Sequence, residues 1–261
     1  MVTAEIVCLG NELLMGITVN TNATYLGEQL TRLGIEVRRI TSVRDDLEQA
    51  SECIKEVIER EPEILIVTGG LGPTYDDIQM EVISKVTGKR LIENKEALEL
   101  IKEHYEKYGL EMSEERRKMA MILEGGKILN NSAGAAPGCL IKYKKTEIFC
   151  LPGVPTEMKS IYTSAIHPYL SSKIKIPITE CKMLAEKCRE SEIAPYINQT
   201  KKKFKELYVK SHPQFGERKG ITIHLSYAGE KGEKIVEEAK RFLIENIKEN
   251  QPKIRITEIG E

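Results

Sequence analysis

The sequence predicts an α/β protein: a three-layer α/β/α sandwich on a mostly parallel sheet, followed by a small α+β domain. In the first part of the chain, apolar runs alternate with amphipathic helical segments, and glycine-rich loops follow several of the runs. This alternation is typical of a parallel sheet covered on both faces. Near Lys175–Thr179 the order changes to β-α-β-β-α-β, as in a ferredoxin-like layer. We therefore expect domains at residues 1–175 and 176–261.

The first strands of the predicted sheet are its clearest elements. Ala4–Leu9 is apolar and ends at Gly10, and Glu63–Val67 is a continuous apolar run, which suits a strand buried on both faces. Around them we expect a strand at Glu36–Val43 and helices at Thr21–Leu33, Leu47–Glu59 and Asp77–Thr87.

The remaining elements are shorter or more polar. For the first domain we expect helices at Asn94–Tyr108, Ser113–Leu123 and Pro155–Leu170, and strands at Lys127–Leu129, Cys139–Tyr143 and Glu147–Leu151. For the second we expect strands at Cys181–Ala185, Glu206–Ser211, Gly220–Tyr227 and Lys253–Glu258, and helices at Glu190–Lys203 and Glu233–Glu249.

Composition narrows the class of protein. With 39 basic and 40 acidic residues among 261, the net charge is -1, which argues against bulk binding to nucleic acid or an anionic membrane. No stretch approaches the ~20 apolar residues of a membrane span, and no signal sequence begins the chain, so we expect a cytoplasmic protein. The 36 Glu and 27 Lys indicate a thermophile.

The six cysteines do not predict a metal site, because they form no CxxC pair and no zinc spacing. Cys8, Cys139 and Cys150 lie in apolar runs and are interpreted as buried small hydrophobes. A disulfide stays open, although nothing specifies a pairing.

The four aspartates occur as two adjacent pairs in a chain that otherwise uses Glu. Asp45-Asp46 precedes a helical run, and N-capping explains it. For Asp76-Asp77, a capping box between Thr74 and Asp77 is one interpretation. The other is a site where the two carboxylates hold Mg²⁺, Mn²⁺ or Co²⁺ beside a phosphate group.

A glycine-rich loop is the strongest local signal for binding. Thr68, Gly69, Gly70 and Gly72 follow a buried strand and precede a helix. Ligands of open α/β sheets bind beyond the carboxyl ends of the strands, where glycines let main-chain N–H groups approach an anion. The loop fits neither GxGxxG nor GxxxxGK[ST], so it predicts a phosphate site of another kind, with a plain turn as the structural alternative.

Three further loops are expected at the same sheet edge. Each alone is typical of an ordinary turn, but four together predict one site. They contribute Asn11 and Glu12; Ser132, Gly134 and Gly138; and Pro152 and Gly153.

Four motifs in fixed order carry a resemblance to a known family: GNELLMGITVNTN, TGGLGPTYDD, NSAGAAPGC and LPGVPTEM. Together they resemble the N-terminal module of the competence/damage-inducible CinA family, which is similar to the MoaB/Mog-type molybdopterin-binding domains of molybdenum-cofactor biosynthesis. The second domain resembles the KH-like domain that follows in CinA proteins.

The resemblance implies hydrolysis of ADP-ribose to AMP and ribose 5-phosphate, dependent on a divalent cation and assisted by K⁺. It places catalysis on Asp77 and Asp76, and the metal on these two residues and Glu12. The alternative is a molybdopterin-binding protein without hydrolysis, which would use the same loops. Gln79 stands where the family commonly has Thr, which affects the expected choice of ligand.

The resemblance also implies a homodimer with a small-molecule nucleotide or pterin ligand. The deamidase domain of full-length bacterial CinA proteins is not expected here. RNA binding is not expected either, because Gly229–Gly232 follows a strand, whereas the GxxG loop of a KH fold joins two helices.

Overall fold

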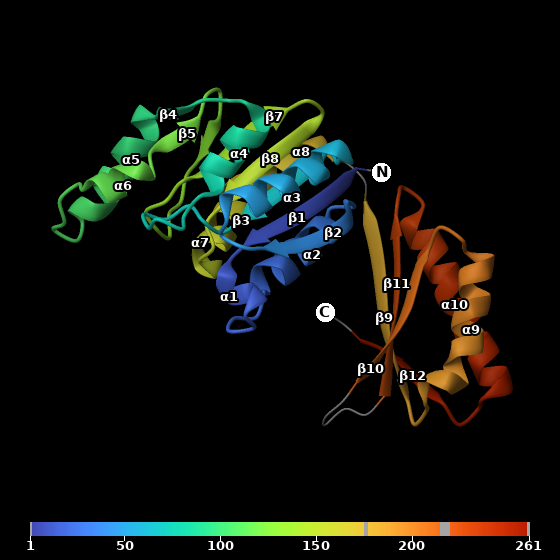
Figure 1. Cartoon of the computed structure of the whole chain (residues 1–261). Coiled ribbons are helices and arrows are strands. Elements are labelled where there is room, and N and C mark those ends of the chain that lie inside the picture. The colour runs from blue at the N-terminus through green and yellow to red at the C-terminus, as the bar shows by residue number, and fades with distance from the viewer. Residues whose placement is uncertain (1, 175–176, 215–219, 260–261) are drawn as a thin grey trace. The chain divides into compact units, whose positions relative to one another are not determined.

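In the computed structural model of the protein, a six-stranded sheet organises the first part of the chain (Figure 1), with the strand order β2-β1-β3-β8-β7-β6. Its strands are β1 (Thr3–Leu9), β2 (Glu36–Val43), β3 (Ile64–Thr68), β6 (Lys127–Leu129), β7 (Gly138–Tyr143) and β8 (Thr146–Leu151). The four strands from β2 to β8 pair in parallel, whereas β7 and β6 pair antiparallel at one edge. The prediction of a mostly parallel sheet is confirmed.

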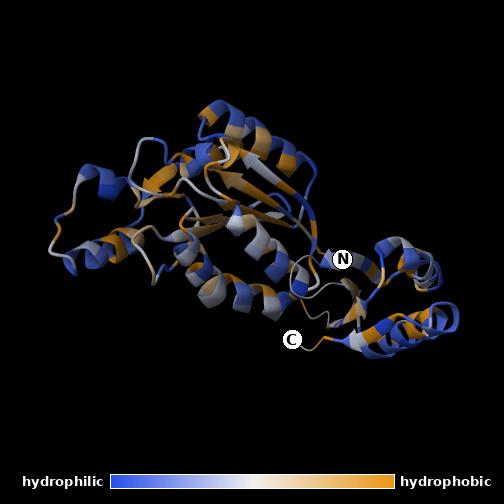
Figure 2. Ribbon diagram, turned by 90° about the horizontal axis from the view of Figure 1, so that it is seen from below, coloured by the Kyte–Doolittle hydropathy of each residue, from blue (hydrophilic) through white to orange (hydrophobic). Residues whose placement is uncertain are grey.

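Helices cover both faces of this sheet. On one face, α3 (Leu47–Glu59), α4 (Gln79–Thr87) and α5 (Lys95–Glu106) share a hydrophobic cluster with alternate strand residues such as Val7 and Val67. On the other, α2 (Thr21–Arg32), α7 (Pro155–Ile161), the π-helix η1 (Tyr162–Ile166) and α8 (His167–Lys173) pack on the intervening residues, such as Ile6 and Ile66. Successive strand residues point to opposite faces, so one apolar run serves both clusters. Figure 2 shows these strands as strongly hydrophobic between helices with hydrophilic outer faces.

The chain forms two compact units, Met1–Ile174 and Lys175–Glu261, and the structure describes residues 2–174, 177–214 and 220–259. The second unit contains β9 (Ile178–Glu186), α9 (Glu190–Lys203), β10 (Tyr208–Gln214), β11 (Gly220–Ala228), α10 (Gly232–Asn250) and β12 (Arg255–Glu258). Its sheet is antiparallel, in the order β10-β11-β9-β12, so β9 lies next to β11 and not β10. This split β-α-β arrangement is the ferredoxin-like one. No helix within the described ranges is long and apolar enough to cross a membrane.

Some predicted elements are wrong. Ser113–Leu123 is not one helix: α6 (Glu114–Lys118) stops early, and β5 (Met121–Leu123) pairs with β4 (Leu91–Glu93), a strand that the sequence pattern does not indicate. The pattern does not indicate the short α1 (Asn11–Leu14) either. Helix α4 begins at Gln79, two residues later than predicted, because residues 74–77 form a hydrogen-bonded turn.

Candidate functional site

The carboxyl ends of β1, β3 and β8 meet at one edge of the sheet, where the predicted loops begin. The N–H of Gly69 donates to the carbonyl of Leu151 at 3.0 Å, which ties the loop after β3 to the end of β8. A Cβ added to Gly153 would lie 3.3 Å from the Cα of Gly69. Glycine at both positions therefore lets the two loops lie in contact.

The loop after β3 needs glycine for its backbone conformation. Gly69 has a φ of 102° and Gly70 a φ of 73°, in the region that side chains disfavour. A Cβ on Gly69 would also overlap the carbonyl oxygen of Leu9. These two residues hold the chain in a turn that brings it back to the start of α4.

Gln79 lies beneath this turn and fixes its peptide groups. Its side chain is fully buried, and Nε2 donates to the carbonyls of Gly69 and, at 3.1 Å, Leu151. Its main-chain N–H donates to the carbonyl of Gly70 at 3.0 Å. A trans peptide directs its N–H opposite to its C=O, so the N–H groups of Gly70 and Leu71 point away from Gln79. Neither has a hydrogen-bond partner within the described part of the chain.

The aspartate pair closes the turn around Thr74 and does not cap α4. Asp77 Oδ2 accepts from the N–H of Thr74 at 2.8 Å. The single hydroxyl proton of Thr74 lies between Asp77 Oδ2, which is 2.6 Å from Oγ1, and Asp76 Oδ1, so the two carboxylates share one donor. The capping-box interpretation is therefore wrong, since the N-cap of α4 is Ile78. Asp77 Oδ2 would lie 2.6 Å from a Cβ on Gly72, so glycine there leaves room for this carboxylate.

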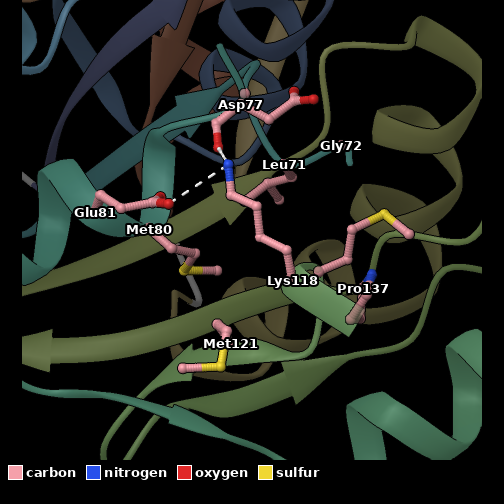
Figure 3. Close-up of a pocket in the computed structure, with 10 residues that line it drawn as sticks. Leu71, Gly72, Asp77, Met80, Glu81, Lys118, Met121 and Pro137 are labelled. Carbon is pink, nitrogen blue, oxygen red and sulfur yellow. Dashed lines mark hydrogen bonds and ion pairs between the residues drawn. The ribbon is translucent and has the colours of Figure 1, made fainter. Parts of the chain in front are cut away.

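Lys118 braces the same turn from α6 (Figure 3). Its Nζ donates to the carbonyls of Asp77 at 2.8 Å and Thr74 at 3.1 Å, and lies 3.5 Å from Oε1 of Glu81. The ammonium group thus places a positive charge beside the aspartate pair.

Asp45 binds the loop of Asn11 and Glu12 and lies in the field of the Asp76-Asp77 turn. Its Oδ2 accepts from the N–H of Asn11 at 2.8 Å, and its neighbour Asp46 caps α3 by accepting from Gln49 at 2.9 Å. Burial raises the pKa of Asp45, the Asn11 hydrogen bond lowers it, and the carboxylates of Glu12, Asp76 and Asp77 raise it further. The N-cap prediction is confirmed for Asp46, whereas Asp45 lies in a shared negative field.

An opening along this edge, here called the glycine-loop hollow, has a volume of about 380 Å³. Its polar side chains are Asp77, Glu157 and Tyr105, and the rest of its wall is main chain or apolar. The other lining residues are Gly70, Leu71, Gly72, Pro73, Met119, Ala135, Ala136, Pro152, Gly153 and Val154. Main-chain donors beside a broad apolar wall suit an anionic group attached to a flat ring.

A second opening, here called the β1–α2 pocket, lies beside the hollow and shares Gly153 with it. It measures about 80 Å³ and has a mixed polar and apolar lining. Thr68 reaches this pocket, but its hydroxyl is engaged: it donates to the carbonyl of Pro152 at 2.8 Å and accepts from Nδ2 of Asn22 at 3.1 Å. The lining residues are Cys8, Leu9, Glu12, Leu13, Thr18, Val19, Asn20, Thr21, Asn22, Thr68, Gly153 and Pro155.

Residues 5–172 match the family described as "Probable molybdopterin binding domain". The chain belongs to this family. A protein from Metallosphaera sedula is 40% identical over 260 residues, covering 99% of this chain and 96% of the relative. One from Sulfolobus acidocaldarius is 42% identical over 246 residues, covering 94% of this chain and 92% of the relative.

A solved structure extends the comparison to CinA proteins. The crystal structure of CinA, a protein of unknown function from Thermoplasma acidophilum, is 35% identical, with a TM-score of 0.60. The match covers 64% of this chain and 98% of that one. The resemblance to CinA is confirmed to that extent, while the KH-like relationship of the second unit stays a prediction.

Within this molybdopterin-binding domain, some predicted site residues lie away from both openings. Asn11 contributes its main chain to Asp45, and the Ser132 hydroxyl lies 2.8 Å from that of Ser160. Gly134 leaves space for the carboxylate of Glu157, because a Cβ there would overlap it. Gly138 is buried in β7, where a Cβ would lie 2.9 Å from the carbonyl oxygen of Cys150.

Sequence reasoning missed several residues of the site. Asn22 and Glu157 lie inside quoted motifs, which was an available signal. Asn131 Nδ2 donates to Glu157 Oε2 at 2.7 Å and holds this carboxylate against the loop that precedes β7. Tyr105 and Lys118 come from a region whose sequence predicts only charged helices, so no local pattern identifies them.

Proposed function

We propose that the first unit binds a phosphorylated pterin or nucleotide at the carboxyl edge of its sheet, as a molybdopterin-binding domain. The observation that carries the proposal is the pair of main-chain N–H groups, of Gly70 and Leu71, turned away from Gln79 at the border of the hollow. Unpaired N–H groups in a glycine turn bind phosphate oxygens. The apolar wall around Met119 and Ala136 gives a ring system a surface to pack against.

Two measurements test this proposal on the full chain. Iodine oxidation of the purified protein, followed by fluorescence chromatography, detects a pterin that is carried through purification. Calorimetric titration with inorganic pyrophosphate measures the anion site by itself. Absence of both a bound pterin and pyrophosphate binding, from folded protein, would contradict the proposal.

A charge placed in the hollow provides a matched pair of variants. Val154 lines the hollow, is 51% exposed and precedes the first turn of α7, a position that tolerates a polar residue. Val154→Glu adds a negative charge near the bound anion, so we expect pyrophosphate affinity to fall about tenfold, or about 1.4 kcal/mol. Val154→Gln has nearly the same shape without the charge and should bind within twofold of wild type. Equal affinity in the two variants would place the anion elsewhere.

The divalent cation that the resemblance implies, held by Asp76, Asp77 and Glu12, stays a prediction. Asp76 Oδ1 and Asp77 Oδ2 contact Thr74, and the described ranges contain no ready-made group of three His, Cys, Asp or Glu side chains that could hold a metal ion. Release of AMP from ADP-ribose, with K⁺ and with Mg²⁺, Mn²⁺ or Co²⁺, tests that prediction directly, and homodimer formation likewise stays a prediction.

A further inference from the structure

Asn22 has a buried hydrogen-bonding atom that the fold does not use. The residue is 9% exposed, and its Nδ2 donates to the carbonyl of Gly153 at 2.8 Å and to Oγ1 of Thr68 at 3.1 Å. Because a carbonyl oxygen only accepts, the atom facing Gly153 is the amide nitrogen, and the orientation of the amide is fixed. Oδ1 is then the atom left without a partner in the described part of the chain.

The pocket around this oxygen contains an acidic side chain and groups that both donate and accept hydrogen bonds. Glu12 contributes a carboxylate and Thr18 and Thr21 contribute hydroxyls, whereas no Lys or Arg is among the described residues that line it. Burial raises the pKa of the Cys8 thiol, so the pocket contains no thiolate at neutral pH. A volume of about 80 Å³ suits a small polar group. The carboxylate of Glu12 and the unpaired oxygen of Asn22 favour a neutral group that donates hydrogen bonds. The phosphate is placed at the hollow, which also has carboxylates, Asp77 and Glu157, but borders the unpaired N–H groups of Gly70 and Leu71.

Gly153 joins this pocket to the glycine-loop hollow, because it lines both. A ligand with phosphate at the Gly70 and Leu71 N–H groups can therefore extend a second group toward Asn22. We propose that the β1–α2 pocket is a second subsite, in which Asn22 Oδ1 accepts a hydrogen bond from a sugar hydroxyl or a ring amino group of the same ligand. This inference rests on the proposed function of the hollow.

Three nucleotides separate the two sources of a donor group. Guanosine 5′-monophosphate carries both groups, its 2′-deoxy form lacks one hydroxyl, and inosine 5′-monophosphate lacks the ring amino group. We expect wild-type protein to bind one of the two depleted nucleotides about fivefold to tenfold more weakly than guanosine monophosphate in calorimetric titrations. The nucleotide that loses affinity identifies the group that enters the pocket.

Two variants then assign this preference to the pocket. Asn22→Ala removes the acceptor, and Thr21→Leu fills the pocket while leaving the hydrogen bonds of Asn22 in place, so it remains informative if Asn22→Ala does not fold. Both should lose the preference among nucleotides, and Thr21→Leu should keep pyrophosphate affinity within twofold. Asn22→Ala also removes the donor to Gly153, which lines the hollow, so only its ratio of nucleotide affinities is compared with wild type. Thr24→Leu is the matched control, because Thr24 is also exposed on α2 but does not line the pocket, and it should behave as wild type.

The outcomes separate this inference from the function on which it rests. Wild-type protein that binds pyrophosphate but does not distinguish the three nucleotides overturns the subsite alone. The same holds if Thr21→Leu retains the wild-type preference, or if it weakens pyrophosphate as much as guanosine monophosphate. Wild-type protein that binds neither pyrophosphate nor any nucleotide overturns the proposed function first.

Discussion

The glycine-loop hollow and the β1–α2 pocket share Gly153 but offer opposite hydrogen-bonding groups. Among the described residues that line the two openings, the N–H groups of Gly70 and Leu71 are unpaired at the hollow, while Asn22 Oδ1, an acceptor, is unpaired at the pocket. Gln79 Oε1, beneath the glycine turn, is a further unpaired acceptor but lines neither opening. The donors depend on backbone conformation, whereas the acceptor at the pocket belongs to a side chain on α2. Glycine and Gln79 therefore control the hollow, while side-chain substitution controls the pocket.

The largest expected effect on stability is that of Gly69→Ala, because Gly69 contacts the loops that border both openings. Gly69→Ala would place a Cβ onto the carbonyl oxygen of Leu9, at a residue whose φ is 102°. We expect the free energy of unfolding to fall by roughly 3 kcal/mol or more and Tm to fall by about 10 °C. Gly88→Ala is the control, because Gly88 also has a positive φ of 68° but nothing lies near its Cβ position. In that variant the free energy of unfolding should fall by only about 1 kcal/mol. Thermal unfolding measures both, and similar losses would show that the contact with Leu9 is unimportant.

An intermediate effect should separate the hollow from the pocket. Gln79→Met keeps the length of the side chain but leaves the buried carbonyl of Gly69 without its side-chain donor, while Leu151 keeps the N–H of Gly69, at a cost of about 2 kcal/mol. The peptide between Gly69 and Gly70 is then no longer fixed, so pyrophosphate affinity should fall about tenfold. Preference among nucleotides, measured as a ratio, should persist. A lower Tm with unchanged pyrophosphate affinity would make Gln79 a purely structural residue.

The smallest effect concerns the negative charge between the two openings. The pKa of Asp45 is raised in the folded protein by burial and by neighbouring carboxylates, so folding favours its protonated form. Its contribution to stability is therefore greatest below the unfolded pKa of about 4 and is lost as pH rises through the higher folded pKa. Asp45→Asn keeps an acceptor for Asn11 and removes the charge.

We expect Asp45→Asn to raise Tm at pH 7 by on the order of 1 °C and to flatten the fall in stability as the pH rises above about 4. Unfolding curves across this range measure both quantities. An unchanged pH profile would show that Asp45 does not experience the field of Glu12, Asp76 and Asp77.

The sequence predicts the sheet well because β1 and β3 are buried on both faces and therefore appear as continuous apolar runs. It fails at Ser113–Leu123, where β5 becomes a strand only by pairing with β4, a partner about 30 residues away. The residues of the site also differ in whether a local sequence pattern predicts them. Glycine turns and the aspartate pair have local patterns, whereas Tyr105 and Lys118 reach the site through tertiary packing.

One hydrogen-bonded cluster also constrains the order of folding. Asn22 and Gly153 are 131 positions apart, and Thr68 and Pro152 are 84 apart, yet these four residues are joined by three hydrogen bonds. Contacts of such long sequence separation carry a large loop-closure cost and depend on nearby structure that is already formed. During synthesis, the strands β1 and β3 emerge well before the loop after β8 completes this cluster. This edge of the sheet is therefore complete only when nearly all of the first unit has been made, and a fragment ending at Gly72 would contain the glycine motif without the loop after β8 that packs against it.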